Sequence, residues 1–395
     1  MVAYQSWTKI NNQRDIIEAL ITEGDMSRVG LAKKLSLSKP ATSENVGKLI
    51  EAGLIFEVGV GNSTLEGGRK PRLLRFNQKY RSIVAVDLSY RQPILAVGDL
   101  TGEILAETKL SVALHEDKKQ KVELLIAAIE DILKKVENIE LGMIVVSSPG
   151  IFTPENKLMF AHAQHGWSNI GLVEGLTERF GVSVIVKNDM NAAVLAEHTL
   201  GSGIGCDNMA YVSCGVGLGA GLIINGELYE GKNFAAGEIS FVLEREGTGK
   251  TKSIEEIVTI ESLLERIRRE VKSQKVPPYV ANLFEKKERI EFSDIVNLAM
   301  KKDPYTIAVI EEVGEKLGVV LGTISALLNV EKIVLGGEYL EFFDILKWPI
   351  RKTLTKVSPF PPKFAPSALG EKVGLLGGFI FGRNILLQEF TYALT

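Results

Sequence analysis

The chain has 395 residues, of which 45% are apolar and 24% charged, with a net charge of −3 and two cysteines. This composition is that of a globular protein of two or three domains. It excludes a disordered chain, a collagen-like repeat and a disulfide-stapled scaffold. The sequence has neither a secretory signal pattern nor an apolar stretch of about 18 residues. We therefore expect a reduced, cytoplasmic protein that does not enter a membrane.

The charge is unevenly distributed along the chain. Residues 1–80 carry 12 lysines and arginines against 8 acids, a net charge of +4, whereas the remainder carries 34 against 41, or −7. A basic head on an acidic body is typical of a nucleic-acid-binding module joined to a domain of another kind.

The first eighty residues are predicted to form three short helices and a hairpin. Apolar side chains recur at helical spacing before Gly24, which ends the first helix. Ser27 caps a second helix, and a third begins near Lys39 and stops at Gly53. Two strands follow, at 55–58 and 71–76. This order predicts a winged helix-turn-helix.

Polar side chains expected on the exposed face of the third helix suit contacts to bases and phosphates in a major groove. They are Lys39, Thr42, Ser43, Asn45 and Lys48. In the loop between the strands, Arg69 and Lys70 follow two glycines, a combination suited to a narrow minor groove. The alternatives are a three-helix packing module with solvated lysines and a protein-interaction domain of the same shape.

Residues 81–395 predict an α/β body built from two similar halves. The first contains strands at 83–86, 94–97 and 103–106, a helix at 121–136 and a buried strand at 142–146. The second contains strands at 209–212, 220–224 and 227–229, then helices and a strand at 332–335. A helix at 303–329 carries Gly314, Gly318 and Gly322 at spacing four, which indicates close helix packing. The repeat predicts a duplicated fold around a cleft.

Three motifs follow one another in this body: 187–193 (KNDMNAA), 215–226 (GVGLGAGLIING) and 235–239 (AAGEI). In this order they resemble the ROK family (repressor, open reading frame, kinase). The resemblance covers nearly the whole chain. It implies a winged helix-turn-helix at 1–80 and a duplicated ribonuclease-H/actin-like sugar-kinase fold at 81–395, with the second lobe from about 190. A winged head before such a body is similar to the repressor branch of the family, which includes xylose and N-acetylglucosamine repressors.

The resemblance implies a sugar site. Asp189 matches the general base of the family's kinases, Asn188 and Glu238 match residues that hold neighbouring hydroxyls, and Glu255 aligns with a further glutamate ligand. Amides and carboxylates suit a polyol because they bond its hydroxyl groups in pairs. A simpler interpretation of Asn188 and Asp189 is a helix cap, which is compatible with a sugar role.

The chain departs from the kinase pattern at both phosphate loops. The segment 87–91 (DLSYR) has no glycine and places Tyr90 where phosphate would approach, and Val216 stands where kinases usually have threonine. The nucleotide residues that the resemblance still implies are Asp87, Gly215, Gly217, Gly336 and Gly337. Mg-ATP binding is therefore doubtful on the sequence but is not excluded by it.

The family's zinc site is also altered. Phe241 replaces a histidine, and Glu246, Thr248 and Ser253 stand in place of the cysteines. Phenylalanine cannot coordinate a metal and the thiolates are missing, so we expect neither zinc nor another metal or cofactor.

These observations favour a sugar-responsive transcriptional regulator, a repressor of carbohydrate-utilisation genes that binds operator DNA and a monosaccharide or small glycoside. We expect a homodimer or homotetramer, because paired heads read near-palindromic operators. One alternative is an ATP-dependent kinase of glucose, N-acetylglucosamine or a similar hexose that retains a DNA-binding head. Another is an interaction protein that has lost both ligands.

Overall fold

The computed structural model describes residues 2–60, 71–89, 92–111, 117–160, 167, 170–245, 249, 251–285, 287 and 290–394. By their contacts they form two compact units. One comprises residues 1–148, 163–187 and 378–395, and the other comprises 149–162 and 188–377. The domain boundaries expected at 80 and about 190 remain predictions.

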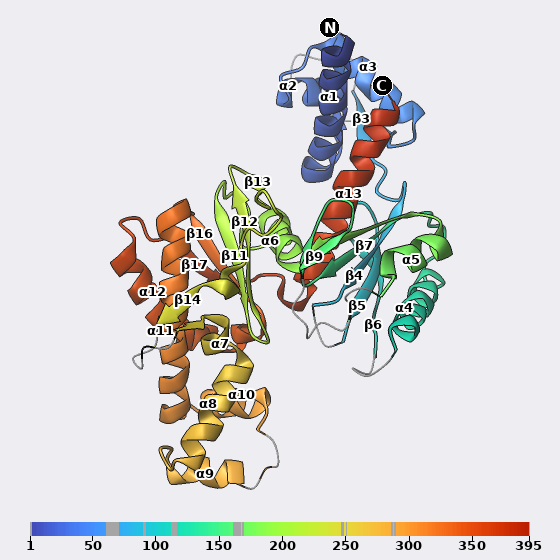
Figure 1. The fold of residues 1–395 in the computed structure, drawn as a ribbon. Helices are drawn as coiled ribbons and strands as arrows, with labels where there is room; N and C mark the ends of the chain where they lie inside the picture. The colour runs from blue at the N-terminus through green and yellow to red at the C-terminus, as the bar shows by residue number, and fades with distance from the viewer. Residues whose placement is uncertain are drawn as a thin grey trace. The chain divides into compact units, whose positions relative to one another are not determined.

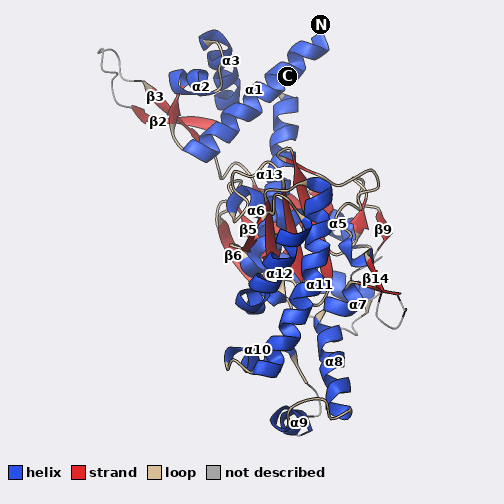
Figure 2. Cartoon of the chain, turned by 90° about the vertical axis from the view of Figure 1, so that its left-hand side faces the viewer, coloured by secondary structure: helices blue, strands red, loops and turns tan. Residues whose placement is uncertain are grey.

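The head has the predicted winged helix-turn-helix arrangement, seen in Figure 2. Its elements are α1 (Val2–Glu23), β1 (Met26–Ser27), α2 (Arg28–Lys34), α3 (Lys39–Glu51), β2 (Ile55–Val60) and β3 (Arg72–Phe76). The predicted caps are present: the Ser27 hydroxyl accepts the Gly30 N–H at 3.0 Å, and Gly53 has φ +76°. The short strand β1, which pairs with β3, was not expected.

The first half of the body contains one five-stranded sheet in the order β10-β7-β4-β5-β6. Its elements are β4 (Ser82–Asp87), β5 (Ile94–Gly98), β6 (Ile104–Lys109), α4 (Lys118–Leu133), β7 (Leu141–Ser148), α5 (Leu172–Phe180) and β10 (Ser183–Asn188). Strands β4, β5 and β6 form the predicted antiparallel meander, and β7 lies parallel to β4. Apolar residues fill β4 and β5, which are buried along their length.

The second half contains a sheet in the equivalent order β17-β16-β11-β12-β13. Its strands are β11 (Met209–Cys214), β12 (Leu218–Ile224), β13 (Glu227–Leu228), β16 (Lys332–Gly336) and β17 (Lys363–Pro366). Again a meander is followed by a parallel strand beside its first strand. The predicted duplication is thus confirmed. Two hairpins belong to the same unit: β8 (Ile151–Phe152) with β9 (Leu158–Phe160), and β14 (Leu243–Arg245) with β15 (Thr251–Ser253).

Helices cover both faces of the second sheet, with α6 on one face and α11 and α12 on the other (Figure 1). The helices are α6 (Asp189–Leu200), α7 (Glu255–Val258), α8 (Ile260–Lys272), α9 (Pro278–Glu285), α10 (Phe292–Met300), α11 (Pro304–Leu328) and α12 (Phe343–Val357), with the 3-10 turns η1 (Ile239–Phe241), η2 (Glu338–Phe342) and η3 (Gly370–Lys372). The glycine stripe of α11 lies against α12: a methyl group on Gly318 would stand 2.8 Å from Thr353 Cβ. The predicted close packing is confirmed.

The last helix, α13 (Val373–Ala393), passes from one unit to the other. Its Gly377 lies against the backbone of Ala192 in α6. Its Gly378 and Gly382 lie against side chains of the first sheet. Within the described part of the chain, no helix combines the length and the apolar character that crossing a bilayer requires.

Candidate DNA-binding and sugar-binding sites

Helix α3 presents fewer polar groups than the sequence suggested. Lys39 and Ser43 are exposed. Thr42 and Asn45 are buried, so the expectation that they lie on the exposed face is wrong. The reason is helical periodicity: Thr42, Asn45 and Val46 share the face that packs inside the head. Each polar side chain is turned back to its own helix, Thr42 Oγ1 donating to Ser38 O at 3.0 Å and Asn45 Nδ2 to Ala41 O at 2.9 Å.

Lys48 is half-buried and is directed at the end of α13. Its Nζ donates to the carbonyl oxygen of Leu394 at 3.0 Å. A cation is favoured there because the last carbonyls of a helix are partly negative and lack intrahelical donors. Lys48 is thus hydrogen-bonded within the protein, whereas Lys39, at the start of the same helix, is exposed.

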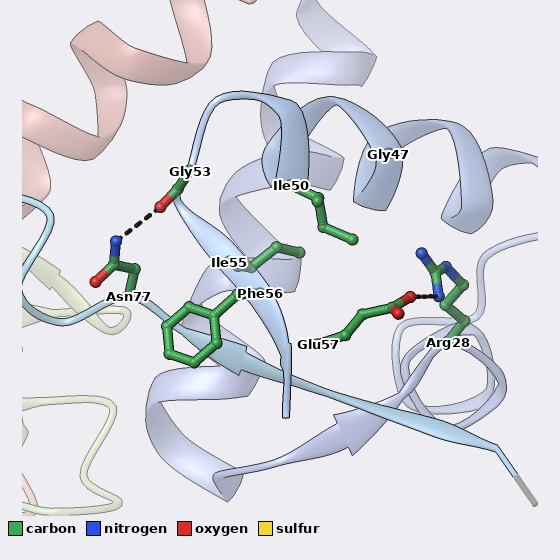
Figure 3. A pocket seen from close by; sticks show the side chains of 8 residues that line it. All are labelled: Arg28, Gly47, Ile50, Gly53, Ile55, Phe56, Glu57 and Asn77. Atoms are coloured by element: carbon green, nitrogen blue, oxygen red, sulfur yellow. Dashed lines mark hydrogen bonds and ion pairs between the residues drawn. The ribbon is translucent and has the colours of Figure 1, made fainter. Parts of the chain in front are cut away.

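A surface hollow lies beside α3 and β2 (Figure 3). At one end the Asn77 amide donates to Gly53 O at 2.9 Å. At the other Arg28 pairs with Glu57 at 2.8 Å, and Arg72 and Arg28 together lower the pKa of Glu57. Arg28 of α2 and Arg72 of β3 are therefore both paired with Glu57. The predicted wing cations Arg69 and Lys70 lie outside the described residues.

In the body, the three segments of the expected sugar site meet on strand β12. A methyl group on Gly219 would stand 2.8 Å from Met190 Cγ, and one on Gly221 would stand 2.3 Å from Met190 O, so α6 begins directly against this strand. Gly237, with φ +87°, lies against Ala220 O. At Gly221 and Gly237 only glycine permits the approach, because any Cβ would collide with backbone, whereas at Gly219 it would meet the Met190 side chain. Glycines therefore bring the start of α6 and the residue after Gly237 to one strand.

Asn188 and Asp189 occupy the start of α6. The Asn188 side chain accepts the Asn191 N–H at 3.0 Å and donates to Gly150 O at 2.9 Å, so the predicted cap is present. Asp189 is buried and accepts the Met190 N–H at 3.1 Å. A helix N-terminus stabilises a carboxylate at this position. The sugar role of both residues stays a prediction.

Glu238 and Glu255 both lie near strand β12, Glu238 directly after Gly237 and Glu255 at the strand's first residue. Glu238 precedes η1 and is half-buried. Glu255 begins α7, and its Oε1 accepts the N–H of Leu218, the first residue of β12, at 3.3 Å. Part of the Glu255 carboxylate is thus committed to the backbone of the glycine loop, and its role as a sugar ligand remains a prediction.

The glycine loop between β11 and β12 has a second carboxylate that sequence reasoning missed. Glu338 Oε2 accepts the Val216 N–H at 3.3 Å. This residue directly follows Gly336 and Gly337, which were singled out as nucleotide residues. A glutamate after two glycines at the end of a buried strand was the available signal. The pairing itself joins positions 122 apart.

The corresponding turn of the first half follows β4. Asp87 is buried and accepts both the N–H and the hydroxyl of Ser89, at 2.9 and 2.5 Å. Burial raises the pKa of Asp87 to about 6, although the Ser89 bonds act to lower it. Tyr90 lies outside the described residues. Asp87 stays a doubtful nucleotide residue.

The residues at the family's zinc positions do not fit a zinc ion. Phe241 packs edge-on against Phe160, with ring centroids 5.7 Å apart. Ser253 is bonded through its N–H and hydroxyl to Glu256, at 2.8 and 3.0 Å. Glu246 and Thr248 lie outside the described residues, and the described ones contain no cluster of three possible metal ligands.

The fold and these sites define a winged helix-turn-helix protein whose head is joined to a duplicated α/β body of the sugar-kinase type. The ROK family model matches residues 83–384, and a model described as winged helix-turn-helix DNA-binding matches residues 11–55. The chain belongs to the ROK family.

Relatives with the same two parts include transcriptional regulators. The xylose repressor of Caldicellulosiruptor bescii is 27% identical over 354 residues, which cover 88% of each chain. The DNA-binding transcriptional dual regulator NagC of Escherichia coli is 30% identical over 338 residues, 82% of this chain and 79% of NagC. The crystal structure of a ROK family transcriptional regulator, described as a homolog of E. coli MLC, has a TM-score of 0.80 at 22% identity and covers 98% of this chain and 99% of its own. That likeness shows the fold.

Proposed function

We propose that the protein is a sugar-responsive transcriptional regulator that acts in the cytoplasm. Its winged heads bind operator DNA, and its body binds a monosaccharide or small glycoside through Asn188, Asp189, Glu238 and Glu255. We further propose that it is a homodimer or homotetramer, because two heads are needed to read a near-palindromic site. The observation that carries the proposal is the presence, in one ROK chain, of a DNA-binding head and of the Asn-Asp pair at the start of α6.

The contacts of α13 suggest how the binding of a sugar at α6 would affect the conformation of the head. At one end, Gly377 lies against Ala192, in the helix that begins with Asp189. The same helix holds the segment before α13, because the buried Glu197 accepts the Leu369 N–H at 3.2 Å and the Ser367 hydroxyl. A displacement of α6 is therefore transmitted to the beginning of α13.

At its other end, α13 packs on the head. Phe390 lies edge-on to Tyr80 at 4.9 Å between ring centroids. The negative charge of Glu18 in α1 offsets part of the burial that lowers the pKa of Arg383. Lys48 of α3 bonds Leu394 O. We infer that sugar binding alters the position of the heads through this helix. The protein would then have two conformations that differ in head position, and a sugar that binds one of them more tightly would change the affinity for DNA.

The DNA half of the proposal is tested with labelled DNA from upstream of the chain's own gene, in mobility-shift and anisotropy titrations. Lys39→Ala should weaken binding about tenfold and reduce the salt dependence by about one counterion. Lys301→Ala, which removes an exposed lysine of the body, is the matched control and should bind as wild type does. Absence of specific binding at moderate salt, with and without sugars, contradicts the proposal.

The sugar half is tested by thermal shift. The names of the relatives place xylose and N-acetylglucosamine first in the panel. A specific sugar at a hundred times its Kd should stabilise the protein by about 2.7 kcal/mol. No shift with any sugar of a broad panel would instead favour a protein that has lost its ligand.

A further inference from the structure

The loop at residues 215–218 has the form of an anion site. Two of its residues are glycines, and the N–H groups of Val216 and Leu218 donate to side-chain carboxylates. Successive backbone N–H groups in a glycine-rich turn attract phosphate and other anions. In this protein both N–H groups already have an anionic partner, Glu338 for Val216 and Glu255 for Leu218, each at 3.3 Å.

The glycines fit these carboxylates closely. A methyl group on Gly215 would stand 1.8 Å from Glu338 Oε2, and one on Gly217 would stand 3.5 Å from Glu255 Oε1. The carboxylate of Glu338 therefore occupies the space that a bare glycine leaves for an incoming oxygen atom. Each of these two N–H groups thus meets a carboxylate oxygen where a phosphate oxygen would otherwise bond.

The residues on both sides of Glu338 are fixed in the fold. Gly337 has φ +78°, and a methyl group there would stand 2.5 Å from Cys214 O, so the β16 end approaches the loop at a position where only glycine fits. After it, Tyr339 and Phe342 of η2 are buried in the core. The backbone of Glu338 is thus anchored on both sides, which places its side chain within reach of the loop.

The surroundings of the loop are negative. Burial, Glu338 and then Glu255 raise the pKa of the Cys214 thiol. Burial also raises the pKa of the Tyr339 hydroxyl, with Cys214 and Glu338 as further causes. The backbone N–H groups of Val216 and Leu218 are donors to these two carboxylates. A phosphate entering here would meet two like charges at close range.

We propose that Glu338 and Glu255 are built-in occupants of this anion loop, and that Glu338 determines its specificity by excluding the phosphates of nucleotides. The loop is then a fixed structural link between β16, α7 and β12 instead of a nucleotide site. Removing the Glu338 carboxylate opens it to inorganic phosphate and to the phosphates of MgADP.

The test is calorimetric titration of the full chain with inorganic phosphate, with MgADP and with adenosine. Glu338→Ala should bind phosphate and MgADP at least about tenfold more tightly than wild type does. Adenosine should show no gain, because it lacks the phosphates. Glu338→Gln, which keeps an acceptor oxygen but not the charge, should fall between the two. Glu341→Ala, at an exposed glutamate of the same turn, should behave as wild type.

Two results overturn the proposal: wild type binding MgADP as tightly as Glu338→Ala, or neither Glu338 variant gaining affinity for phosphate while both remain folded by circular dichroism. A Glu338→Ala protein that does not fold leaves Glu338→Gln to decide by the same criterion. The outcome is separate from the proposed regulatory function, since DNA and sugar binding are measured without nucleotide.

Discussion

The two halves of the body have equivalent sheets, but the backbone N–H groups in the turn after the first strand are bonded differently in each half. After β4, Asp87 bonds the N–H of its own neighbour Ser89. After β11, a glycine loop is bonded by Glu338 and Glu255, which arrive from distant parts of the chain. In both turns a carboxylate of the protein accepts N–H groups at the place where the family resemblance implies nucleotide contacts.

The two turns also differ in how their carboxylates affect the stability of the fold. Asp87 is buried and accepts hydrogen bonds from Ser89, and burial raises its pKa. Glu338 and Glu255 instead bond a loop that includes the exposed Val216. Charge at the first turn should destabilise the protein at neutral pH. At the second turn we expect the carboxylates mainly to exclude other anions, such as phosphate, from the loop.

The largest effect is expected for Asp87→Asn. A carboxyl pKa raised from 3.8 to about 6 means that the protonated form is favoured in the folded state. Its stabilising contribution is complete below the unfolded pKa and is lost as pH rises through about 6, a difference of about 3 kcal/mol. Asparagine does not ionise. Relative to wild type, the variant should therefore gain stability between about pH 4 and 6 and keep the gain at pH 7.

Urea unfolding of both proteins at several pH values measures this difference. Asp99→Asn is a suitable comparison, because Asp99 is also buried and also accepts the N–H and hydroxyl of a residue two positions on. A difference between Asp87→Asn and wild type that does not change with pH would contradict the account of the first turn.

The second prediction compares how a helix meets each sheet. Gly221→Ala should destabilise the protein by about 1–3 kcal/mol, because the new methyl group would stand 2.3 Å from a backbone oxygen of α6. Gly378→Ala, where α13 meets the first sheet, should cost less than about 1 kcal/mol, since its nearest neighbour is the Ala85 methyl at 3.1 Å.

Thermal denaturation gives both values. Gly221→Ala should also weaken sugar binding, because it shifts the start of α6, whereas Gly378→Ala should not. Equal destabilisation by the two substitutions would contradict the view that the helix at Gly221 packs more closely on its sheet than the helix at Gly378 does.

A smaller effect is expected inside the glycine loop. Gly215→Ala should displace Glu338 and cost about 1 kcal/mol for the lost hydrogen bond. Gly217→Ala meets Glu255 at an ordinary contact distance and should be nearly neutral. Chemical denaturation of the two variants side by side distinguishes them. A larger cost for Gly217→Ala would mean that Glu338 is not the closer occupant of the loop.

Much of the fold was predictable because its signals are local. Ser27 and Gly53 mark helix ends by the bonds and angles they favour, and alternating apolar segments predicted both meanders. Even the glycine stripe of α11 was interpreted correctly as packing.

The site was less predictable because it depends on which face of a helix is covered and on contacts between distant residues. Thr42 and Asn45 are polar, yet they lie on the buried face of α3 and bond their own backbone. Lys48 meets a residue 346 positions away. The position of Glu338 after two glycines was a local signal, but its partner Val216 is 122 positions away and could not be predicted from the sequence around it.

The central claim is that a sugar bound at the start of α6 changes the affinity of the head for DNA. Its most direct test is the anisotropy of labelled operator titrated with the full chain, with and without the sugar found by thermal shift. We predict a change in Kd of about 5-fold to 150-fold. Asp189→Asn should still bind DNA but should lose the response. An operator affinity unchanged by a sugar that does bind, or a full response in Asp189→Asn, would contradict the account.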